Sequence, residues 1–312
     1  MRALITGATG FVGRHLKSYL ESAGDEVVGL TDDVDIAHSA SLFGEFERLA
    51  ANPFDAIYHL AALAHVGDSF GSAMEVFRVN VLGTVNLLEV ARKFFPQARI
   101  LYVSSSEVYG KVPSASLPVD ESVRLAPLSP YAASKAAAEQ AVKQAFMAYQ
   151  QKVLIARPFN HIGPGQSDSY VVSALAKRVL KAKQDGKPSI VVGNLASKRD
   201  FTDVRDVIAA YRRIIEAGIS GETYNVCSGK STSVRDLAEM ITELAGAEVA
   251  LEIDPSLARD VEVTDICGDA SKCQEALSWK PVIPIADSLR DVLGWWSVRL
   301  RASQGSSEDH SL

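Results

Sequence analysis

The stretch TGATGFVG, residues 6–13, joins a short apolar run (Ala3–Thr6) to an amphipathic segment (Val12–Ala23). Glycines lack a Cβ atom, so the backbone can turn sharply there and approach a pyrophosphate closely. A helix that starts at this point offers free N–H groups and a partial positive charge to the phosphate. The spacing G-x-x-G-x-x-G differs from the general G-x-G-x-x-G fingerprint, and tight turning alone is the competing interpretation. Because a strand precedes the loop and a helix follows it, we interpret it as a dinucleotide site made by Gly7, Gly10, Phe11, Val12 and Gly13.

The first half of the chain alternates short β-branched runs with longer helical patterns. The predicted strands are Ala3–Thr6, Glu26–Leu30, Ala56–Leu60, Ile100–Ser104 and Val153–Arg157, and the predicted helices are Val12–Ala23, Met74–Lys93 and Pro130–Tyr149. Strands separated by helices predict right-handed crossovers and a parallel sheet. The strands are continuously apolar, as expected where helices cover both faces. The fold class is therefore α/β, a doubly wound parallel (Rossmann) sheet with a smaller C-terminal α/β domain.

The pattern changes after Arg157, where prolines and glycines interrupt it. Residues 1–158 are predicted to form the dinucleotide-binding domain, which parts of 203–226 complete, and residues 159–301 to form mainly a substrate domain. The predicted elements there are helices Val171–Lys183, Val204–Ala217, Val234–Ala245 and Ile285–Leu300, and strands Ser189–Val192, Thr223–Val226 and Val249–Ile253. Residues 302–312 carry little apolar content, so we expect a disordered tail.

Composition excludes several classes of protein. The chain has 312 residues, and 32 Lys plus Arg against 38 Asp plus Glu give a net charge of −6, which argues against a nucleic-acid footprint. No apolar run is long enough to span a membrane, and the N-terminus lacks the pattern of a signal peptide. The three cysteines, Cys227, Cys267 and Cys273, lack metal-ligand spacing. We therefore expect a cytoplasmic protein with free, buried thiols and no metal.

The second predicted strand is followed by an acidic residue that could bind the hydroxyls of a ribose. Asp32 follows Gly13 at close to the distance, about 20 residues, at which an acid binds the adenosine ribose hydroxyls. Such an acid would repel the 2′-phosphate of NADP, and no Arg or Lys lies between Lys17 and Arg48 to receive it. We therefore expect NAD(H) to be favoured over NADP(H). A turn residue is the alternative for Asp32, and Asp35 and Ile36 are expected against the adenine.

Tyr131 and Lys135 lie at positions i and i+4 of a predicted helix and share one face. A tyrosine hydroxyl titrates near pH 10, and a neighbouring ammonium lowers its pKa. Such a pair can give a proton to a carbonyl oxygen while a hydride arrives. Ser104, Ser105 and Ser106 end a predicted strand, where parallel-sheet proteins place their ligands. An exposed helix pair is the alternative, but the glycine loop and the serines favour catalysis.

These motifs resemble those of the extended short-chain dehydrogenase/reductases that modify nucleotide sugars. The matching segments are TGATGFVG (6–13), HLAA (59–62), SSSEVYG (104–110), SPYAASK (129–135) and RPFNHIGPGQ (157–166), and they cover the chain to about Leu300. NHIGPGQ (160–166), VGNLASKRDFTDVRD (192–206) and YNVCSG (224–229) are similar to the GDP-4-dehydro-6-deoxy-D-mannose reductases, which make GDP-D-rhamnose.

The resemblance implies roles for individual residues. Ser105 would supply the hydroxyl of the catalytic triad, Tyr131 the acid, and Lys135 the tuning charge and ribose anchor. Leu60, Ala61 and Ala62 would line the cofactor. Ser106, Glu107 and Asn160 would line the sugar-nucleotide side, and Arg199 and Arg259 would bind the diphosphate, which the planar guanidinium fork suits. For each arginine a solvated surface charge is the alternative, and His161 is interpreted as a packing residue rather than a catalyst.

The same family contains 4,6-dehydratases, which need an extra base, usually Glu, and often an Asp acid just before it. Here Ser106 occupies the Asp position while Glu107 remains. The missing Asp favours a reductase, and a dehydratase or a 4-epimerase is the alternative. Glu107 would then have the alternative role of stabilising the loop after the strand by hydrogen bonds. A dinucleotide-binding regulator without catalysis is a minor alternative. The resemblance also implies a homodimer through helices near Val81–Lys93 and Tyr131–Tyr149. The assignment of guanine as the base of the sugar nucleotide rests on resemblance alone. The stereochemistry of the product at C4 (D-rhamnose or 6-deoxy-D-talose) stays open.

Overall fold

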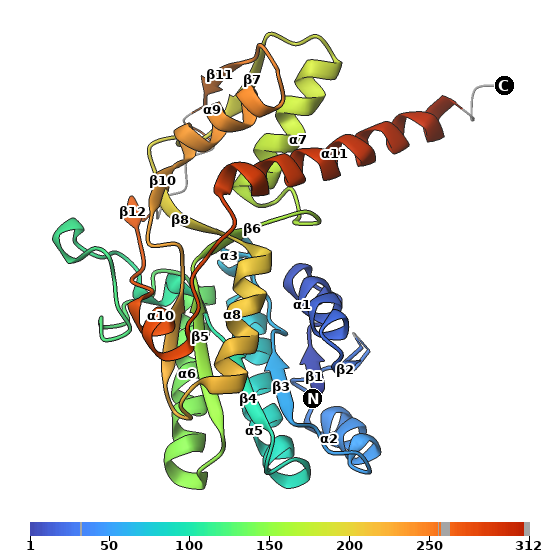
Figure 1. Ribbon diagram of the computed structural model, residues 1–312, viewed down its shortest axis with the longest axis vertical. Helices are drawn as coiled ribbons and strands as arrows, with labels where there is room; N and C mark the ends of the chain where they lie inside the picture. The colour runs from blue at the N-terminus through green and yellow to red at the C-terminus, as the bar shows by residue number, and fades with distance from the viewer. Residues whose placement is uncertain (32, 255, 257–262, 309–312) are drawn as a thin grey trace.

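The predicted α/β class and parallel Rossmann sheet are confirmed by the computed structural model, which describes residues 1–31, 33–254, 256 and 263–308. Six parallel strands form the main sheet in the order β2-β1-β3-β4-β5-β9 (Figure 1). They are β2 (Glu26–Gly29), β1 (Arg2–Thr6), β3 (Ala56–His59), β4 (Arg99–Val103), β5 (Val153–Pro158) and β9 (Thr223–Val226). The chain leaves β1 toward β2 and then returns to β3 on the other side. The carboxyl end of β1 is thus the switch point at which such sheets bind ligands.

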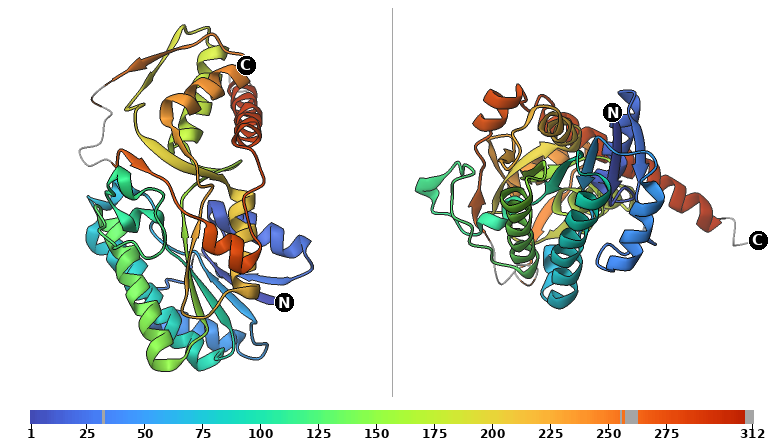
Figure 2. Two further views of the ribbon diagram at one scale, coloured as in Figure 1. Left: turned by 60° about the vertical axis from the view of Figure 1, so that its left-hand side comes forward. Right: turned by 90° about the horizontal axis from the view of Figure 1, so that it is seen from below.

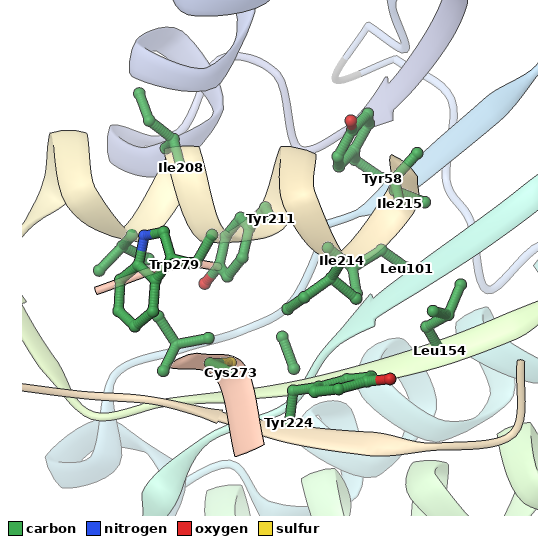
Figure 3. Packing of buried hydrophobic residues seen from close by; sticks show 14 of the residues in the cluster. Tyr58, Leu101, Leu154, Ile208, Tyr211, Ile214, Ile215, Tyr224, Cys273 and Trp279 are labelled. Atoms are coloured by element: carbon green, nitrogen blue, oxygen red, sulfur yellow. The ribbon is translucent and has the colours of Figure 1, made fainter. Parts of the chain in front are cut away.

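Helices cover both faces of the sheet, which explains the continuously apolar strands. Helices α1 (Phe11–Ser22) and α8 (Val204–Ala217) pack against one face in a cluster that includes Leu16, Tyr58 and Ile214. Figure 3 shows side chains of α8 reaching toward the strands. Helices α2 (Ser39–Leu49), α5 (Gly83–Phe94) and α6 (Pro130–Tyr149) cover the other face in a second cluster. Burial of apolar area from both sides is the main stabilising force of this layer.

The single helix predicted over Met74–Lys93 is divided into α4 (Ala73–Phe77), a π-helical turn η1 (Arg78–Leu82) and α5. Asn80 lies in this turn, and its amide is fully bonded. Its Oδ1 accepts from the Leu63 backbone N–H at 2.8 Å, and its Nδ2 donates to the Leu63 carbonyl and to Ser134 Oγ. The π-turn therefore ties the segment after β3, with the short α3 (Val66–Ser69), to helix α6.

The C-terminal elements form a smaller α/β unit beyond the carboxyl edge of the main sheet (Figure 2). Helices α7 (Val171–Gln184), α9 (Val234–Leu244) and α11 (Ile285–Glu308) share one apolar cluster. The strands are β6 (Asn160–Ile162), β7 (Ser189–Val192), β8 (Lys198–Asp203), β10 (Ser231–Ser233), β11 (Ala250–Ile253) and β12 (Asp265–Ile266). Strand β8 pairs with β6, β10 and β12, and β7 pairs with β11. Helix α10 (Ser271–Leu277) packs instead on α8 and β9.

The C-terminal helix is longer than the sequence predicts. Helix α11 continues from the predicted end at Leu300 to Glu308, so the expected disordered segment from 302 is helical through 308, and 309–312 lie outside the described residues. Helix growth adds one bond per residue once a helix is nucleated, so a polar segment can extend a packed helix.

All three cysteines are free and buried, as predicted. Over the described ranges, no helix has the length and apolar character needed to cross a membrane.

Candidate active site

A cavity of about 640 Å³ opens along the carboxyl edge of the main sheet. Most of the residues predicted for the cofactor line it, namely Gly7, Gly10, Phe11, Val12, Gly13, Asp35, Ile36, Leu60, Ala61, Ala62, Tyr131 and Lys135. Ser104–Glu107 and Pro158–His161 also line it. Asp32 lies outside the described residues. Segments from five strand ends thus converge on a space of the size that drug-sized ligands and cofactors occupy.

The glycine loop is shaped so closely that side chains would not fit. A Cβ atom on Gly13 would lie 2.1 Å from the Gly7 carbonyl oxygen and 2.8 Å from the Ala8 Cα. Gly7 has φ of +70°, and a Cβ there would lie 2.8 Å from the Ala61 backbone nitrogen. Helix α1 begins immediately after Gly10, so its first N–H groups face the cavity. This bare cradle at a helix N-terminus fits a dinucleotide pyrophosphate.

Asp35, which lines the cavity, binds a cation that the sequence did not predict. Arg78 Nη1 lies 2.8 Å from Asp35 Oδ2, and its other nitrogens bond Glu75 at 2.7 and 2.8 Å. The pKa of Asp35 is lowered, mainly by its hydrogen bond to Arg78. This arginine lies on η1, far along the chain from Asp32, so the sequence around Asp32 does not indicate it. Two carboxylates bind it, so the trio has a net negative charge.

The three residues predicted to be catalytic lie together. Ser129 caps α6 by accepting a hydrogen bond from the Ala132 N–H at 3.1 Å, and this fixes Tyr131 in the first turn. Ser105 follows β4 and hydrogen-bonds the Tyr131 side chain. Lys135, one turn along α6, donates to the Val103 carbonyl oxygen at 2.8 Å. All three residues line the same cavity.

Burial controls the protonation of this group. Desolvation lowers the pKa of Lys135 to about 7, against the opposing charge of Glu139. Desolvation also raises the pKa of Tyr131, although its hydrogen bond to Ser105 opposes this. The lowering of the Tyr131 pKa that we expected from Lys135 is therefore not found, because removal of the phenolate from water dominates the shift. Tyr131 carries its proton at neutral pH, as a proton donor must.

A second cavity of about 390 Å³ continues from the first into the C-terminal unit. Six residues line both cavities, namely Val66, Glu107, Asn160, His161, Gln166 and Tyr170. Arg199 from β8 lines the far part together with Arg178 and Asn194. Ser106 is buried and faces only the first cavity, and Arg259 lies outside the described residues. The structure thus brings Glu107, Asn160 and Arg199 to one continuous cleft.

Several cavity residues carried no sequence signal. Tyr170 comes from an irregular loop, and its ring contacts His65 edge-on at 6.0 Å. Tyr211 from α8 also lines the first cavity. His161 behaves as the predicted packing residue: its ring stacks on Phe11 and its Nδ1 bonds the Phe159 carbonyl oxygen. In the part of the chain that the structure describes, no three His, Cys, Asp or Glu residues could together hold a metal ion.

The chain is similar to known proteins over nearly its whole length. A GDP-6-deoxy-D-mannose reductase of Pseudomonas aeruginosa is 37% identical over 303 residues, which cover 96% of this chain and 98% of the relative. The structure of RMD from Pseudomonas aeruginosa complexed with NADPH has a TM-score of 0.88 and 38% identity, covering 96% and 99% of the two chains. The UDP-glucose 4-epimerase of Thermus thermophilus in complex with NAD has a TM-score of 0.84 and 27% identity, covering 95% and 99%.

The family of GDP-mannose 4,6 dehydratase matches residues 33–292. This match, together with the full-length relatives, confirms the resemblance that the motifs indicated. The chain belongs to this family, within the extended short-chain dehydrogenase/reductases.

Proposed function

We propose that this protein reduces the C4 ketone of GDP-4-dehydro-6-deoxy-D-mannose to form GDP-D-rhamnose, with NAD(P)H as the reductant. The observation that carries the proposal is the convergence of Ser105, Tyr131 and Lys135 on a dinucleotide-sized cavity that continues into a second one. The substrate follows from the full-length relative that is a GDP-6-deoxy-D-mannose reductase. A non-catalytic regulator is disfavoured, because the complete triad would then have no use.

The proposed chemistry divides among the three residues. A bound nicotinamide cofactor would supply the hydride to C4. Ser105 holds the carbonyl oxygen by its hydroxyl, and Tyr131, protonated because burial raises its pKa, gives its proton as the alkoxide forms. Lys135 beside it stabilises the resulting phenolate. Asn160 and Ser106 line the sugar, and Arg199 binds the diphosphate, with Arg259 proposed for the same task.

Glu107 decides between reduction and 4,6-dehydration. It lines both cavities, and the family match includes GDP-mannose 4,6 dehydratase, so a dehydratase is the second candidate. A dehydratase uses the glutamate to remove the C5 proton, whereas a reductase needs no base there. We expect Glu107→Gln to keep more than half of the reductase activity. GDP-mannose with oxidised cofactor is expected to give no 4-keto-6-deoxy sugar.

The measurement is NMR analysis of the products from GDP-4-dehydro-6-deoxy-D-mannose and, separately, from GDP-mannose. Rapid conversion of GDP-mannose by the unmodified protein, lost in Glu107→Gln, would contradict the reductase assignment and favour the dehydratase. The same spectra distinguish D-rhamnose from 6-deoxy-D-talose at C4.

We further propose that NAD(H) is favoured over NADP(H), although the related RMD structure contains NADPH. Asp35 and Glu75 both bind Arg78, so its charge is neutralised at the adenosine end. A 2′-phosphate there would meet an excess of carboxylate charge, and Asp32 in the sequence adds to it.

Removing Asp35 should therefore change the cofactor preference. We expect Asp35→Ala to narrow the ratio of kcat/KM for NADH over NADPH by roughly tenfold, because the freed Arg78 can make a charge-assisted bond to the phosphate. Asp185→Ala, which removes an exposed partner of Lys187 far from the cavity, is the matched control. A clear NADPH preference of the unmodified protein would refute the proposal.

A homodimer in the cytoplasm completes the proposal. The segments predicted to meet, Val81–Lys93 and Tyr131–Tyr149, belong to α5 with its preceding turn and to α6. Large apolar side chains lie exposed on these elements and on the adjoining α4, among them Met74 (90% exposed), Leu82 and Met147. Exposed apolar side chains that gather into a patch are typical of a surface that pairs with another chain. Free thiols agree with a reducing compartment.

A further inference from the structure

A completely buried ion pair lies behind the candidate catalytic residues. Arg157 on β5 bonds both oxygens of Glu139 on α6, with Nε to Oε1 at 2.9 Å and Nη2 to Oε2 at 2.7 Å. Glu139 is 0% exposed and Arg157 is 2% exposed. Neither residue lines the cavity, so neither is placed to touch a substrate or cofactor. The proposed mechanism does not use this pair.

Glu139 also holds the chain beside the catalytic serine. The Ser104 hydroxyl donates to Glu139 Oε1 at 2.6 Å, and Ser104 directly precedes Ser105. Arg157 in turn binds the Tyr109 hydroxyl at 2.9 Å, and Tyr109 ends the turn that starts at Ser106. The pair therefore grips both ends of the segment that carries Ser105 and Glu107.

Glu139 lies one helical turn after Lys135, on the same face of α6. The other groups around Lys135 give it little charge compensation. Tyr102 on β4 presents its ring at 5.1 Å from Nζ, and burial raises the pKa of that tyrosine, so it is neutral. His59 on β3 is neutral near pH 7, because its pKa is lowered to about 3, mainly by burial. Tyr131 is also protonated, which leaves Glu139 as the anion acting on Lys135 among these groups.

We propose that Glu139 is a positioning residue of the active site: held by Arg157, its carboxylate fixes the Ser104–Ser105 turn and favours the charged form of the buried Lys135. A buried ion pair is by itself weak evidence for a stabilising role, because apolar residues of similar volume often stabilise a core as well. The effect of Glu139 on the charge of Lys135 explains the buried pair better than a gain in stability does. Charges interact strongly where water is excluded, so one anion near Lys135 can decide its charge near neutral pH.

The direct test measures the charge of Lys135 without any turnover. In protein labelled with [ε-13C]lysine, the Lys135 resonance is assigned by its loss in Lys135→Arg, and its pH titration is followed. We expect a midpoint near pH 7 in the unmodified protein, from the pKa of about 7. In Glu139→Gln the attraction is gone, so the ammonium loses its proton more easily and the midpoint falls by about 1–3 pH units. An unchanged midpoint in a folded Glu139→Gln protein would overturn the proposal.

Glu139→Gln leaves Arg157 buried without its anion and can fail to fold. The double variant Glu139→Gln with Arg157→Met leaves no buried guanidinium without its anion, and the Lys135 titration midpoint is measured in it in the same way. We expect it to fold and to show the lowered midpoint; a folded double variant with the original midpoint means a purely structural pair. Lys143→Met is the matched control, since it removes the half-exposed partner of Glu139 at 3.8 Å, and its midpoint should stay in place.

Turnover gives a second readout, which rests on the proposed reductase function. The alkaline limb of kcat/KM should move to lower pH in Glu139→Gln, together with the Lys135 midpoint. In Ser104→Ala the charge remains, so this limb should stay while kcat falls several-fold because Ser105 is less well held. If the unmodified protein reduces no 4-keto sugar, the proposed function fails, while the lysine titration still tests this inference.

Discussion

Replacing Tyr131 by phenylalanine is expected to lower kcat by about 10²–10⁴-fold, the usual contribution of a positioned acid. The substitution removes one hydroxyl and keeps the ring. Tyr131 is 8% exposed, so the ring should keep its packing between the cavity and α6. The dissociation constant for the dinucleotide should change little, because the glycine loop and the Asp35 end are untouched. Steady-state kinetics with a 4-keto nucleotide sugar, together with a fluorescence titration of NADH, check both parts.

Tyr58→Phe is the matched control for this prediction. Tyr58 is another buried tyrosine, on β3, outside the cavity, and its hydroxyl has no hydrogen-bond partner among the described residues. Removing it deletes the same atom without touching the proposed chemistry, so turnover should remain at the level of the unmodified protein. A Tyr131→Phe protein that kept more than half of its turnover would remove Tyr131 from the role of acid.

The parts of the site that the sequence could predict are local in the chain. Gly7, Gly10 and Gly13 lie within one turn between a strand and a helix, so their spacing alone indicates a phosphate cradle. Tyr131 and Lys135 are one helical turn apart, and a predicted helix is enough to place both on one face. In each case the geometry of one element determines which side chains meet.

The parts that escaped prediction depend on pairing between distant elements. Arg78 on η1 meets Asp35 only through the folding of distant segments, and Glu139 meets Arg157 only because α6 covers β5. The direction of the Tyr131 pKa shift was predicted wrongly for the same reason. Burial depends on everything that surrounds the side chain, whereas the sequence offered only the neighbouring lysine.

Secondary structure shows a similar division. Helix α2 was missed, although Leu42, Phe46 and Leu49 are its buried residues and recur at helical spacing. The strands β6, β8, β10 and β12 were not predicted either, since β6, β10 and β12 have three residues or fewer and β8 is largely polar in sequence. These strands are held by their pairing with β8, which the sequence pattern does not show. The π-helical turn within the predicted Met74–Lys93 helix contains Asn80, which bonds Leu63 in the segment after β3, a contact that the local pattern does not indicate.

A second large effect is expected at Gly13. We expect Gly13→Ala to raise the dissociation constant for the dinucleotide by at least about 100-fold, which corresponds to about 2.7 kcal/mol. The added methyl group would lie 2.1 Å from the Gly7 carbonyl oxygen, so the backbone of the loop must move. That movement displaces the N–H groups at the start of α1 from the phosphate position. Fluorescence titration with NADH measures the loss, and circular dichroism checks that the fold persists.

The loss of dinucleotide affinity on substitution by alanine should depend on the space around the added Cβ at each glycine. At Gly10 a Cβ would lie 3.3 Å from the Gly7 carbonyl oxygen, so Gly10→Ala needs only a small shift and should weaken binding less than Gly13→Ala. Gly44 lies exposed in α2 with no atom within 4 Å of an added Cβ, and Gly44→Ala should stabilise that helix by about 0.5–1 kcal/mol without changing binding. Equal dinucleotide affinity in Gly13→Ala and Gly44→Ala would mean that the loop does not hold the pyrophosphate. The same methyl group thus has opposite consequences at two glycines, because backbone contact at Gly13 and open solvent at Gly44 determine its cost.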